Sequence, residues 1–238
     1  MAEIICQGVR FAAIEAVIFD KDGTLADSHQ YLHHLGKKRA ECIAAIAPNL
    51  KDAVLEAFGF EQGRLDPAGF LARSTREEDE SVIASLMIQA GYPSSEASAI
   101  VQAAFRSADQ QLPRKATLTP LFPGVIELIQ SFSSLKLGIL TSDSEANLQE
   151  FINCYQLSSC FQGNVGAQAG ISKPNPQLLS LICEVLNVDP EATLVIGDTI
   201  ADTQLTRRSI GVTWGGSTIA QLAGAAAIAH QPAEIRLL

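Results

Sequence analysis

The sequence predicts an α/β protein with a doubly wound parallel sheet as its core and an all-helical segment inserted after the first core strand. Two observations lead to this fold class. From Leu118 onward, short apolar strands alternate with amphipathic helices, a pattern typical of βαβ units with helices on both faces of a parallel sheet. Between His29 and Lys115, apolar residues recur at three- and four-residue spacing, and no strand pattern is present.

The N-terminal stretch predicts two elements. Residues 4–11 form a short hairpin that turns at Gly8, and residues 16–19 form a fully buried apolar strand. Asp20 and Asp22 follow this strand and precede a turn at Gly23. Because residues two apart in an extended segment point the same way, both carboxylates are expected to face one site, where a cation or a shared proton would offset their repulsion. The alternative is an Asp-rich turn that caps a helix.

The inserted segment divides the chain. Helices are predicted from His29, from about Arg76 to Ala90 and from Ser95 to Gln110, with breaks at the glycines and the proline between 59 and 69. We therefore expect an α/β core domain made of residues 1–28 and 116–238, and a helical domain made of residues 29–115. The helical domain holds ten of the 17 lysines and arginines but 11 of the 26 acidic residues, so it supplies most of the cationic groups.

The second part of the core is predicted as alternating helices and strands. The helices are 123–132, one that starts at 143–144, and 174–186, and the strands are 137–141, a short one within 161–167, 194–197, 210–214 and an edge strand at 225–229.

Polar residues stand at or just after the ends of these strands. They are Thr141, Lys173, Asp198 and Asp202, and parallel strands would bring them together with Asp20 and Asp22 at one edge of the sheet. Four carboxylates around one lysine and one hydroxyl are too acidic without a divalent cation, and all-oxygen ligands suit Mg²⁺. The plainer alternatives are a strand-end threonine, a solvated loop lysine and acidic residues at a helix N-terminus.

The composition excludes several classes of partner. The net charge of −9 argues against nucleic acid and anionic membrane surfaces, which are bound by clustered lysine and arginine. Five scattered cysteines form no metal-binding or disulfide pattern, and no secretory signal or membrane-spanning run is apparent. We therefore expect a cytoplasmic protein that acts on a small molecule, whereas the oligomeric state is left open.

The order of these motifs resembles that of the haloacid dehalogenase (HAD) superfamily. The matching residues are the DxDGTL run from Asp20 to Leu25, the strand-end Thr141, the pair Lys173-Pro174 and the GDxxxD run from Gly197 to Asp202. The helical insert is similar to the cap of the phosphoglycolate-phosphatase-like subgroup. The resemblance covers nearly the whole chain and implies a Rossmann-like core.

The resemblance also implies roles for the acidic residues. Asp20 would attack the phosphorus of a phosphomonoester and form an aspartyl-phosphate. Asp22 would protonate the leaving group and then deprotonate the hydrolytic water. The metal ligands would be Asp20, the backbone carbonyl of Asp22 and Asp198, and Asp202 would support them.

The remaining implied roles concern substrate. Thr141 and the backbone N–H groups of Ser142 and Asp143 would hold the phosphoryl oxygens, and Lys173 would offset charge on the nucleophile and on the phosphoryl group. Ser142 or Ser144 as a plain helix cap is the alternative reading of this stretch. In the cap, Arg73 or Arg76 would bind a second anionic group of the substrate.

Three further features of the sequence have two interpretations each. The stretch around Arg73 and Arg76 contains two capping-box patterns, Ser74 with Glu77 and Thr75 with Glu78. His29 and His33 are spaced for a metal site, but a solvated helix face is the preferred interpretation. Alternation points Lys21 away from the site, toward a surface or salt-bridge role.

The expected activity is that of a Mg²⁺-dependent phosphatase for a small phosphomonoester, such as phosphoglycolate or a sugar phosphate. The dehalogenase branch of the superfamily lacks the second acid of the first motif, and so does the phosphonate-cleaving branch, whereas this chain has Asp22. A sugar-phosphate mutase of the β-phosphoglucomutase type would use the same catalytic residues. A catalytically silent binding protein on the same fold is the other alternative.

Overall fold

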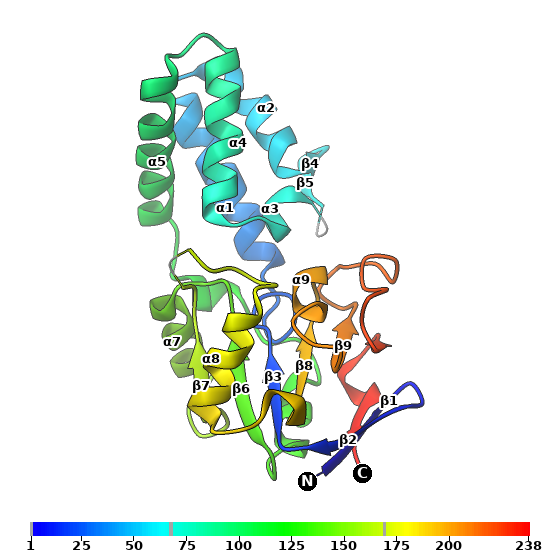
Figure 1. Cartoon of the computed structure of the whole chain (residues 1–238). Coiled ribbons are helices and arrows are strands. Elements are labelled where there is room, and N and C mark those ends of the chain that lie inside the picture. Colours follow the sequence, from blue (N-terminus) through cyan, green and yellow to red (C-terminus); the bar gives the residue numbers. More distant parts are fainter. Residues whose placement is uncertain (1, 67–68, 169) are drawn as a thin grey trace. The chain divides into compact units, whose positions relative to one another are not determined.

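The computed structural model describes residues 2–66, 69–168 and 170–238, apart from the side chain of Arg73. The chain divides into two compact units. Figure 1 shows both, with colours that follow the position along the chain. We call Met1–Asp27 with Thr119–Leu238 the core unit, and Ser28–Leu118 the helical unit.

A six-stranded parallel sheet forms the centre of the core unit. Its strand order is β10-β9-β8-β3-β6-β7, and all neighbouring pairs are parallel. The strands are β3 (Ala16–Phe19), β6 (Lys136–Leu140), β7 (Gly163–Val165), β8 (Thr193–Gly197), β9 (Ser209–Val212) and β10 (Ala227–Ala229). The predicted α/β fold class is thereby confirmed. The chain continues from β3 to β6 on one side, while β8 pairs with β3 on the other, so β3 lies at the switch point of the sheet.

Helices cover both faces of the sheet, as its mostly buried strands require. They are α6 (Val125–Ser131), α7 (Glu145–Cys154), α8 (Pro176–Leu186) and the short α9 (Ile200–Thr203). Ala16 and Ile18 of β3 belong to a buried cluster with residues of α8. On the opposite face, the Phe19 ring lies 6.5 Å from that of Phe132, which ends α6. The alternation of strand residues therefore assigns odd and even positions of β3 to different layers.

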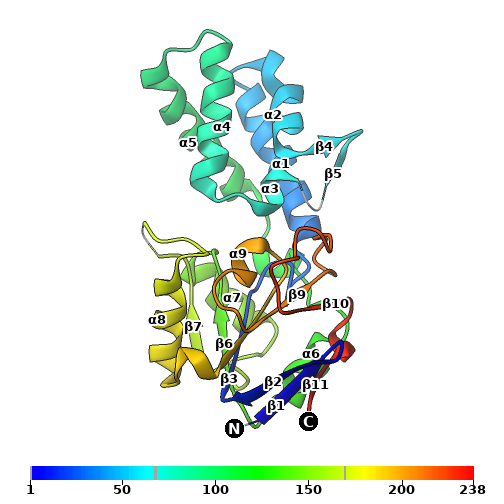
Figure 2. The same cartoon turned by 45° about the vertical axis from the view of Figure 1, so that its right-hand side comes forward.

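A three-stranded antiparallel sheet, visible in Figure 2, lies at the two chain ends. It consists of β1 (Ala2–Cys6), β2 (Val9–Ile14) and β11 (Ile235–Leu237). Gln7 and Gly8 both have positive φ, 47° and 82°, and form the tight turn of the predicted hairpin. The third strand was not predicted, because a three-residue segment carries too short an alternation to identify a strand.

The helical unit consists of α1 (His29–Ala44), α2 (Lys51–Phe58), α3 (Phe70–Arg73), α4 (Arg76–Gln89) and α5 (Ser94–Gln111). Thr75 and Glu78 form the capping box of α4, whereas Ser74 hydrogen-bonds Asp79 instead. The unit also has a minute antiparallel ladder, β4 (Phe60–Glu61) with β5 (Arg64–Leu65), in a span where the sequence predicted no strand. This ladder could not be predicted, because a strand of two residues is too short to show the alternation of apolar and polar residues that identifies a strand.

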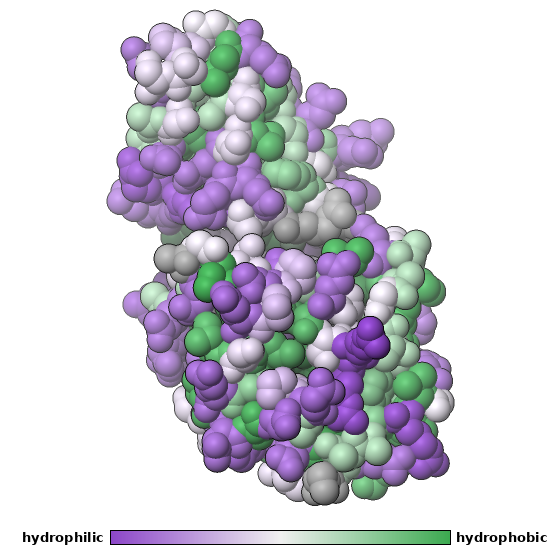
Figure 3. Space-filling view, viewed as in Figure 1, coloured by the Kyte–Doolittle hydropathy of each residue, from purple (hydrophilic) through white to green (hydrophobic). Residues whose placement is uncertain are grey.

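Each unit has its own buried apolar side chains. In the helical unit these include Ile43, Val54, Phe58, Ile83 and Phe105, all without exposed surface. The face shown in Figure 3 mixes hydrophilic areas with smaller hydrophobic ones. Among the described helices, none combines the length and the apolar character that a membrane crossing requires.

Candidate active site

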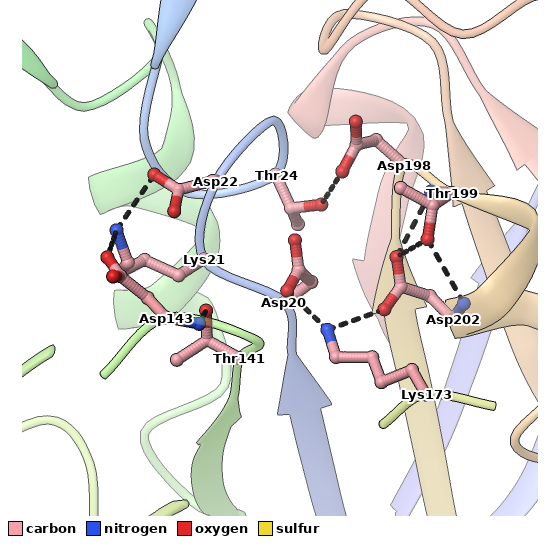
Figure 4. Close-up of polar contacts among 10 residues, drawn as sticks. All are labelled: Asp20, Lys21, Asp22, Thr24, Thr141, Asp143, Lys173, Asp198, Thr199 and Asp202. Atoms are coloured by element: carbon pink, nitrogen blue, oxygen red, sulfur yellow. Dashed lines mark hydrogen bonds and ion pairs between the residues drawn. The ribbon is translucent and has the colours of Figure 1, made fainter. Parts of the chain in front are cut away.

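The sheet brings the predicted strand-end residues of the core unit together. Asp20 follows β3, and its backbone N–H donates to the carbonyl of Ile196 in β8 at 2.9 Å. Thr141 follows β6 and Asp198 follows β8, while Lys173 reaches the same place from the loop before α8. Figure 4 shows these side chains around the end of β3. Parallel strands ending at one edge account for this convergence of distant residues.

Lys173 links two of the carboxylates. Its Nζ donates to Oδ1 of Asp20 and, at 2.7 Å, to Oδ1 of Asp202, and only 6% of its side chain is exposed. The second oxygen of Asp202 accepts from the N–H and the hydroxyl of Thr199, at 3.1 and 2.5 Å. This reciprocal cap of α9 holds Asp202, so Asp202 positions Lys173 beside Asp20.

Burial dominates the electrostatics of this cluster. Desolvation raises the pKa of Asp20 to about 7, although the charge of Lys173 opposes that shift. Burial also raises the pKa of Asp198 well above its ordinary value, and the charges of Asp20 and Asp202 add to the effect. Burial alone would lower the pKa of Lys173, but the attraction of Asp20 and Asp202 raises it above its ordinary value. Negative charge is therefore in excess at this edge of the sheet.

A divalent cation fits this set of donors. Asp20, Asp198 and Asp202 each offer a carboxylate oxygen, and these oxygens lie within 4.8 Å of one another. Three buried carboxylates with one lysine leave a net negative charge, and hard oxygen donors match Mg²⁺. Because both oxygens of Asp202 already accept hydrogen bonds, Asp20 and Asp198 are the better-placed ligands.

The turn after Asp20 is shaped by close packing against Asp198. Gly23 has a φ of 85°, and a Cβ atom at this position would lie 2.1 Å from Oδ2 of Asp198. The hydroxyl of Thr24 donates to Oδ1 of Asp198 at 3.1 Å, and the indole N–H of Trp214 donates to the Thr24 carbonyl at 2.9 Å. The glycine and threonine of the first motif therefore orient a candidate metal ligand. The sequence analysis did not assign Thr24 or Trp214 to the site.

The second acid of the first motif, Asp22, forms an ion pair with Nζ of Lys21 at 2.8 Å, and the chain leaves the extended conformation directly after Asp20. The charge of Asp22 still contributes to the raised pKa of Asp20, and its catalytic role stays a prediction. Lys21 also pairs with Asp143 at 2.9 Å and is 1% exposed. Its surface location was therefore wrong, whereas its salt-bridge role is confirmed. Nothing in the local sequence indicated the burial of a lysine.

The predicted phosphoryl-binding segment lies at the start of α7. The hydroxyl of Thr141, which is buried, accepts the backbone N–H of Asp143 at 3.1 Å. Ser142 is exposed, and Ser144 caps α7 by accepting the N–H of Asn147 at 3.2 Å. The strand end and the helix start thus bring the Thr141 hydroxyl and the backbone N–H of Asp143 together, in a hydrogen bond that an anion would replace if it accepted from this N–H.

The cationic residues of the helical unit have separate surroundings. Arg76 forms ion pairs with Glu80 at 2.9 Å and Asp109 at 2.5 Å, and Arg73 has no described side chain. A cavity of about 550 Å³ is lined by His29, Gln30, His33, Arg64 and Leu65. Within the described ranges, the one group of potential metal ligands is the carboxylate cluster, which includes no histidine.

The fold and this site define the class of protein. A buried carboxylate with a raised pKa, beside a buried lysine at the switch point of a parallel sheet, is typical of an enzyme active site. The model of the family described as haloacid dehalogenase-like hydrolase matches residues 14–208. The chain therefore belongs to this family of hydrolases, and its resemblance to the HAD superfamily is confirmed.

Curated relatives and solved structures agree with this membership. The chain is 28% identical over 209 residues to a phosphoglycolate phosphatase of Synechococcus elongatus, covering 85% of both chains. It is 25% identical to a phosphoglycolate phosphatase of Escherichia coli over 87% of this chain and 84% of the relative.

Among solved structures, one described as a predicted phosphoglycolate phosphatase from Haemophilus somnus has a TM-score of 0.69 at 18% identity, covering 94% of this chain and 97% of the other. A haloacid dehalogenase-like family hydrolase from Streptococcus pneumoniae has a TM-score of 0.64 at 21% identity, covering 94% and 97%. At these identities, the structures show the shared fold.

Proposed function

We propose that the protein is a Mg²⁺-dependent phosphatase that hydrolyses a small phosphomonoester through an aspartyl-phosphate on Asp20. The observation that carries the proposal is the contact between Asp20 and Lys173, with Asp198 beside them in a buried cluster of excess negative charge. The lysine and a cation keep Asp20 ionised for attack, and both attract a phosphoryl dianion. The phosphoglycolate phosphatases among the relatives support a phosphomonoester as the substrate class.

The proposed reaction has two halves. An Asp20 oxygen attacks phosphorus, the bond to the leaving oxygen breaks, and the carboxyl of Asp22 gives its proton to that oxygen. Water then attacks the phosphorus of the aspartyl-phosphate and loses a proton to the Asp22 carboxylate, which releases inorganic phosphate and restores Asp20. Proton transfer to and from Asp22 therefore balances over one turnover.

The other predicted residues would bind and stabilise. Thr141 and the N–H groups of Ser142 and Asp143 hold phosphoryl oxygens, and Lys173 offsets the charge that develops on them. Asp20, Asp198 and the Asp22 carbonyl would hold Mg²⁺, which would supply positive charge to the reaction. Asp202 serves by holding Lys173, a role that its contacts with Lys173 and Thr199 support.

Substrate selection is assigned to the helical segment. We propose that residues 29–115 act as a cap on a core of residues 1–28 and 116–238, and that a cap arginine binds a second anionic group. Arg76 would have to exchange one of its two carboxylate partners for the substrate, and Arg73 is the other candidate.

The test is phosphate release from a panel of small phosphomonoesters, including phosphoglycolate and sugar phosphates, with Mg²⁺ or with EDTA. We expect turnover with Mg²⁺ that EDTA removes and that Asp20→Asn abolishes. Asp189→Asn is the matched control, because Asp189 caps the short helix Pro190–Ala192 and has no contact with the cluster. Isomerisation of a sugar phosphate that requires added bisphosphate would instead establish a mutase, and a folded protein without turnover would establish a binding role.

A further inference from the structure

Lys21 is a buried cation that the proposed reaction does not use. It is among the largest fully buried side chains of the protein and stands between the two acids of the first motif. The odd positions of β3, which include Phe19, face the layer of α6. Beyond the strand, Lys21 lies 5.3 Å from the Phe151 ring of α7. In Figure 4 it stands on the other side of the end of β3 from Lys173.

The partners of Lys21 are themselves held in place. Its Nζ lies 2.8 Å from Oδ1 of Asp22 and 2.9 Å from Oδ2 of Asp143. The other oxygen of Asp143 accepts the N–H of Ser144 at 3.0 Å and the side-chain amide of Asn147 at 2.7 Å. A chain of polar contacts thus runs from the first turn of α7 through Asp143 and Lys21 to Asp22, as Figure 4 shows in part.

Burying this lysine is costly, so the arrangement needs a reason. A buried ammonium loses several kcal/mol of hydration, which its ion pairs offset only with good geometry. An apolar side chain beside Phe151 would avoid this cost. What the lysine provides is a buried, fixed cation beside Asp22, whose own side chain is 26% exposed.

We propose that Lys21, anchored by Asp143, is a positioning residue that holds the carboxyl group of Asp22 for proton transfer in the phosphatase reaction. The inference rests on the proposed function, because it assumes that Asp22 is the general acid and base. Lys21 itself touches neither the phosphoryl group nor Asp20. Its effect passes through Asp22, and it is confined to the steps in which a proton moves.

Because Lys21 affects only the proton-transfer steps, its loss should slow some substrates and not others. An alkyl phosphate needs its leaving oxygen protonated as the bond to phosphorus breaks, whereas 2,4-dinitrophenyl phosphate releases a stable phenolate without a proton. Loss of Asp22 positioning therefore slows the first half-reaction of the alkyl substrate and spares that of the activated aryl substrate. A merely structural defect slows both.

The experiment compares Lys21→Met with the wild type in the presence of Mg²⁺. We expect kcat/KM for the preferred alkyl phosphate to fall about 100-fold, in the range for loss of a general acid. The pre-steady-state burst of dinitrophenolate should change by less than about threefold, and the slow phase after it should be retarded, because the water attack also needs Asp22. Lys21→Arg should restore part of the alkyl activity.

Two further variants keep the test decisive. Asp143→Asn leaves Lys21 in place but weakens the ion pair that anchors it. Activity on the alkyl phosphate should again fall selectively, to a smaller degree than in Lys21→Met. This variant replaces Lys21→Met in the experiment if Lys21→Met does not fold. Lys136→Met is the matched control, since Lys136 binds only the carbonyls of Leu186 and Asn187, and both substrates should respond equally. Equal losses for the two substrates in Lys21→Met or Asp143→Asn would overturn the inference alone, whereas wild-type protein inactive on both would overturn the proposed function and the inference with it.

Discussion

Each unit of the protein buries an ion pair, and the two differ in charge balance. In the core unit, Lys173 contacts Asp20 and Asp202, and Asp198 lies in the same cluster. In the helical unit, Arg39 meets Asp79 at 2.5 Å, with both side chains at most 6% exposed. The first cluster has more acids than bases, whereas the second pair is neutral.

The helical-unit pair is completed by groups without an evident chemical role. The hydroxyl of Ser74 donates to Asp79, and the guanidinium of Arg39 lies 4.2 Å from the centre of the Phe105 ring. Burial raises the pKa of Asp79, while Ser74 and Arg39 oppose that shift. A neutral pair of this kind ties α1 to the start of α4.

The comparison teaches how to distinguish a structural ion pair from a functional one. A balanced buried pair compensates its own charge within the protein, whereas an excess of one sign is stabilised by a ligand of the other sign. The predictions below test whether this difference in balance separates chemistry from stability.

The largest effect is expected for the nucleophile. Asp20→Asn should lower phosphate release by at least about 10⁴-fold, because no nucleophile remains to form the covalent intermediate. Without a divalent ion, the same change should leave the unfolding free energy equal or higher, since it removes one charge from an overcrowded cluster. Turnover and urea unfolding measured on one preparation check both parts, and a marked loss of stability would contradict the charge-excess interpretation.

The helical-unit pair should show the reverse. Arg39→Met leaves a buried carboxylate alone and should lower the unfolding free energy by about 3–5 kcal/mol. Because the pair has no assigned part in the reaction, kcat of the folded fraction should stay within about threefold. The double variant Arg39→Met/Asp79→Leu should recover most of the stability in urea unfolding, and failure to recover any would mean that the geometry of the pair, not its charge, is essential.

The core cluster should make stability depend on pH in EDTA. The folded-state pKa of Asp20 is raised from 3.8 to about 7, so between these values the folded state binds a proton that the unfolded state has lost. The contribution of Asp20 to the unfolding free energy is therefore largest near pH 4. It falls as the pH rises to about 7, by on the order of 2 kcal/mol.

Thermal unfolding from pH 5 to 8.5 measures this slope. Mg²⁺ should reduce it and raise Tm most at the alkaline end, since the ion binds the ionised carboxylates. Asp20→Asn should flatten the slope in EDTA. An unchanged slope in that variant would assign the pH dependence to other groups.

The smallest effects are expected at the two arginines of the helical unit that we propose as anion-binding residues. Arg76→Ala should cost less than about 1 kcal/mol of stability, because its ion pairs are partly exposed, and should leave KM unchanged. Arg73→Ala should raise KM about tenfold for a substrate with a second anionic group and not for one without it. Steady-state kinetics on both substrates, with Arg76→Ala as the control, separate the two residues, and an unchanged KM in Arg73→Ala would exclude it as the anion-binding residue.

Much of the core could be predicted from local patterns. The buried run that ends at Asp20, the strand before Asp198 and the helix starts at His29 and Arg76 all carry periodicity or capping signals within a few residues. The convergence of Asp20, Lys173, Asp198 and Asp202 followed from the geometry of parallel strands, and their assigned roles stay predictions. The ion pair of Asp22 with Lys21 was not predicted, because alternation describes side chains only while the chain stays extended.

The amino-acid sequence by itself determined the α/β class, the helical insert and the strand ends at which the polar residues stand. These features depend on the strand period of two residues and the helix period of 3.6 residues, which can be recognised within a short stretch of sequence. Only the tertiary structure decided which buried charges meet. Lys173 pairs with Asp20, 153 residues away in the sequence, and Arg39 pairs with Asp79, 40 residues away. Contacts between residues this far apart produce no periodic pattern in the sequence. The burial of Lys21 between Asp22 and Asp143 has the same origin, because its cost is offset only once α7 packs beside the end of β3.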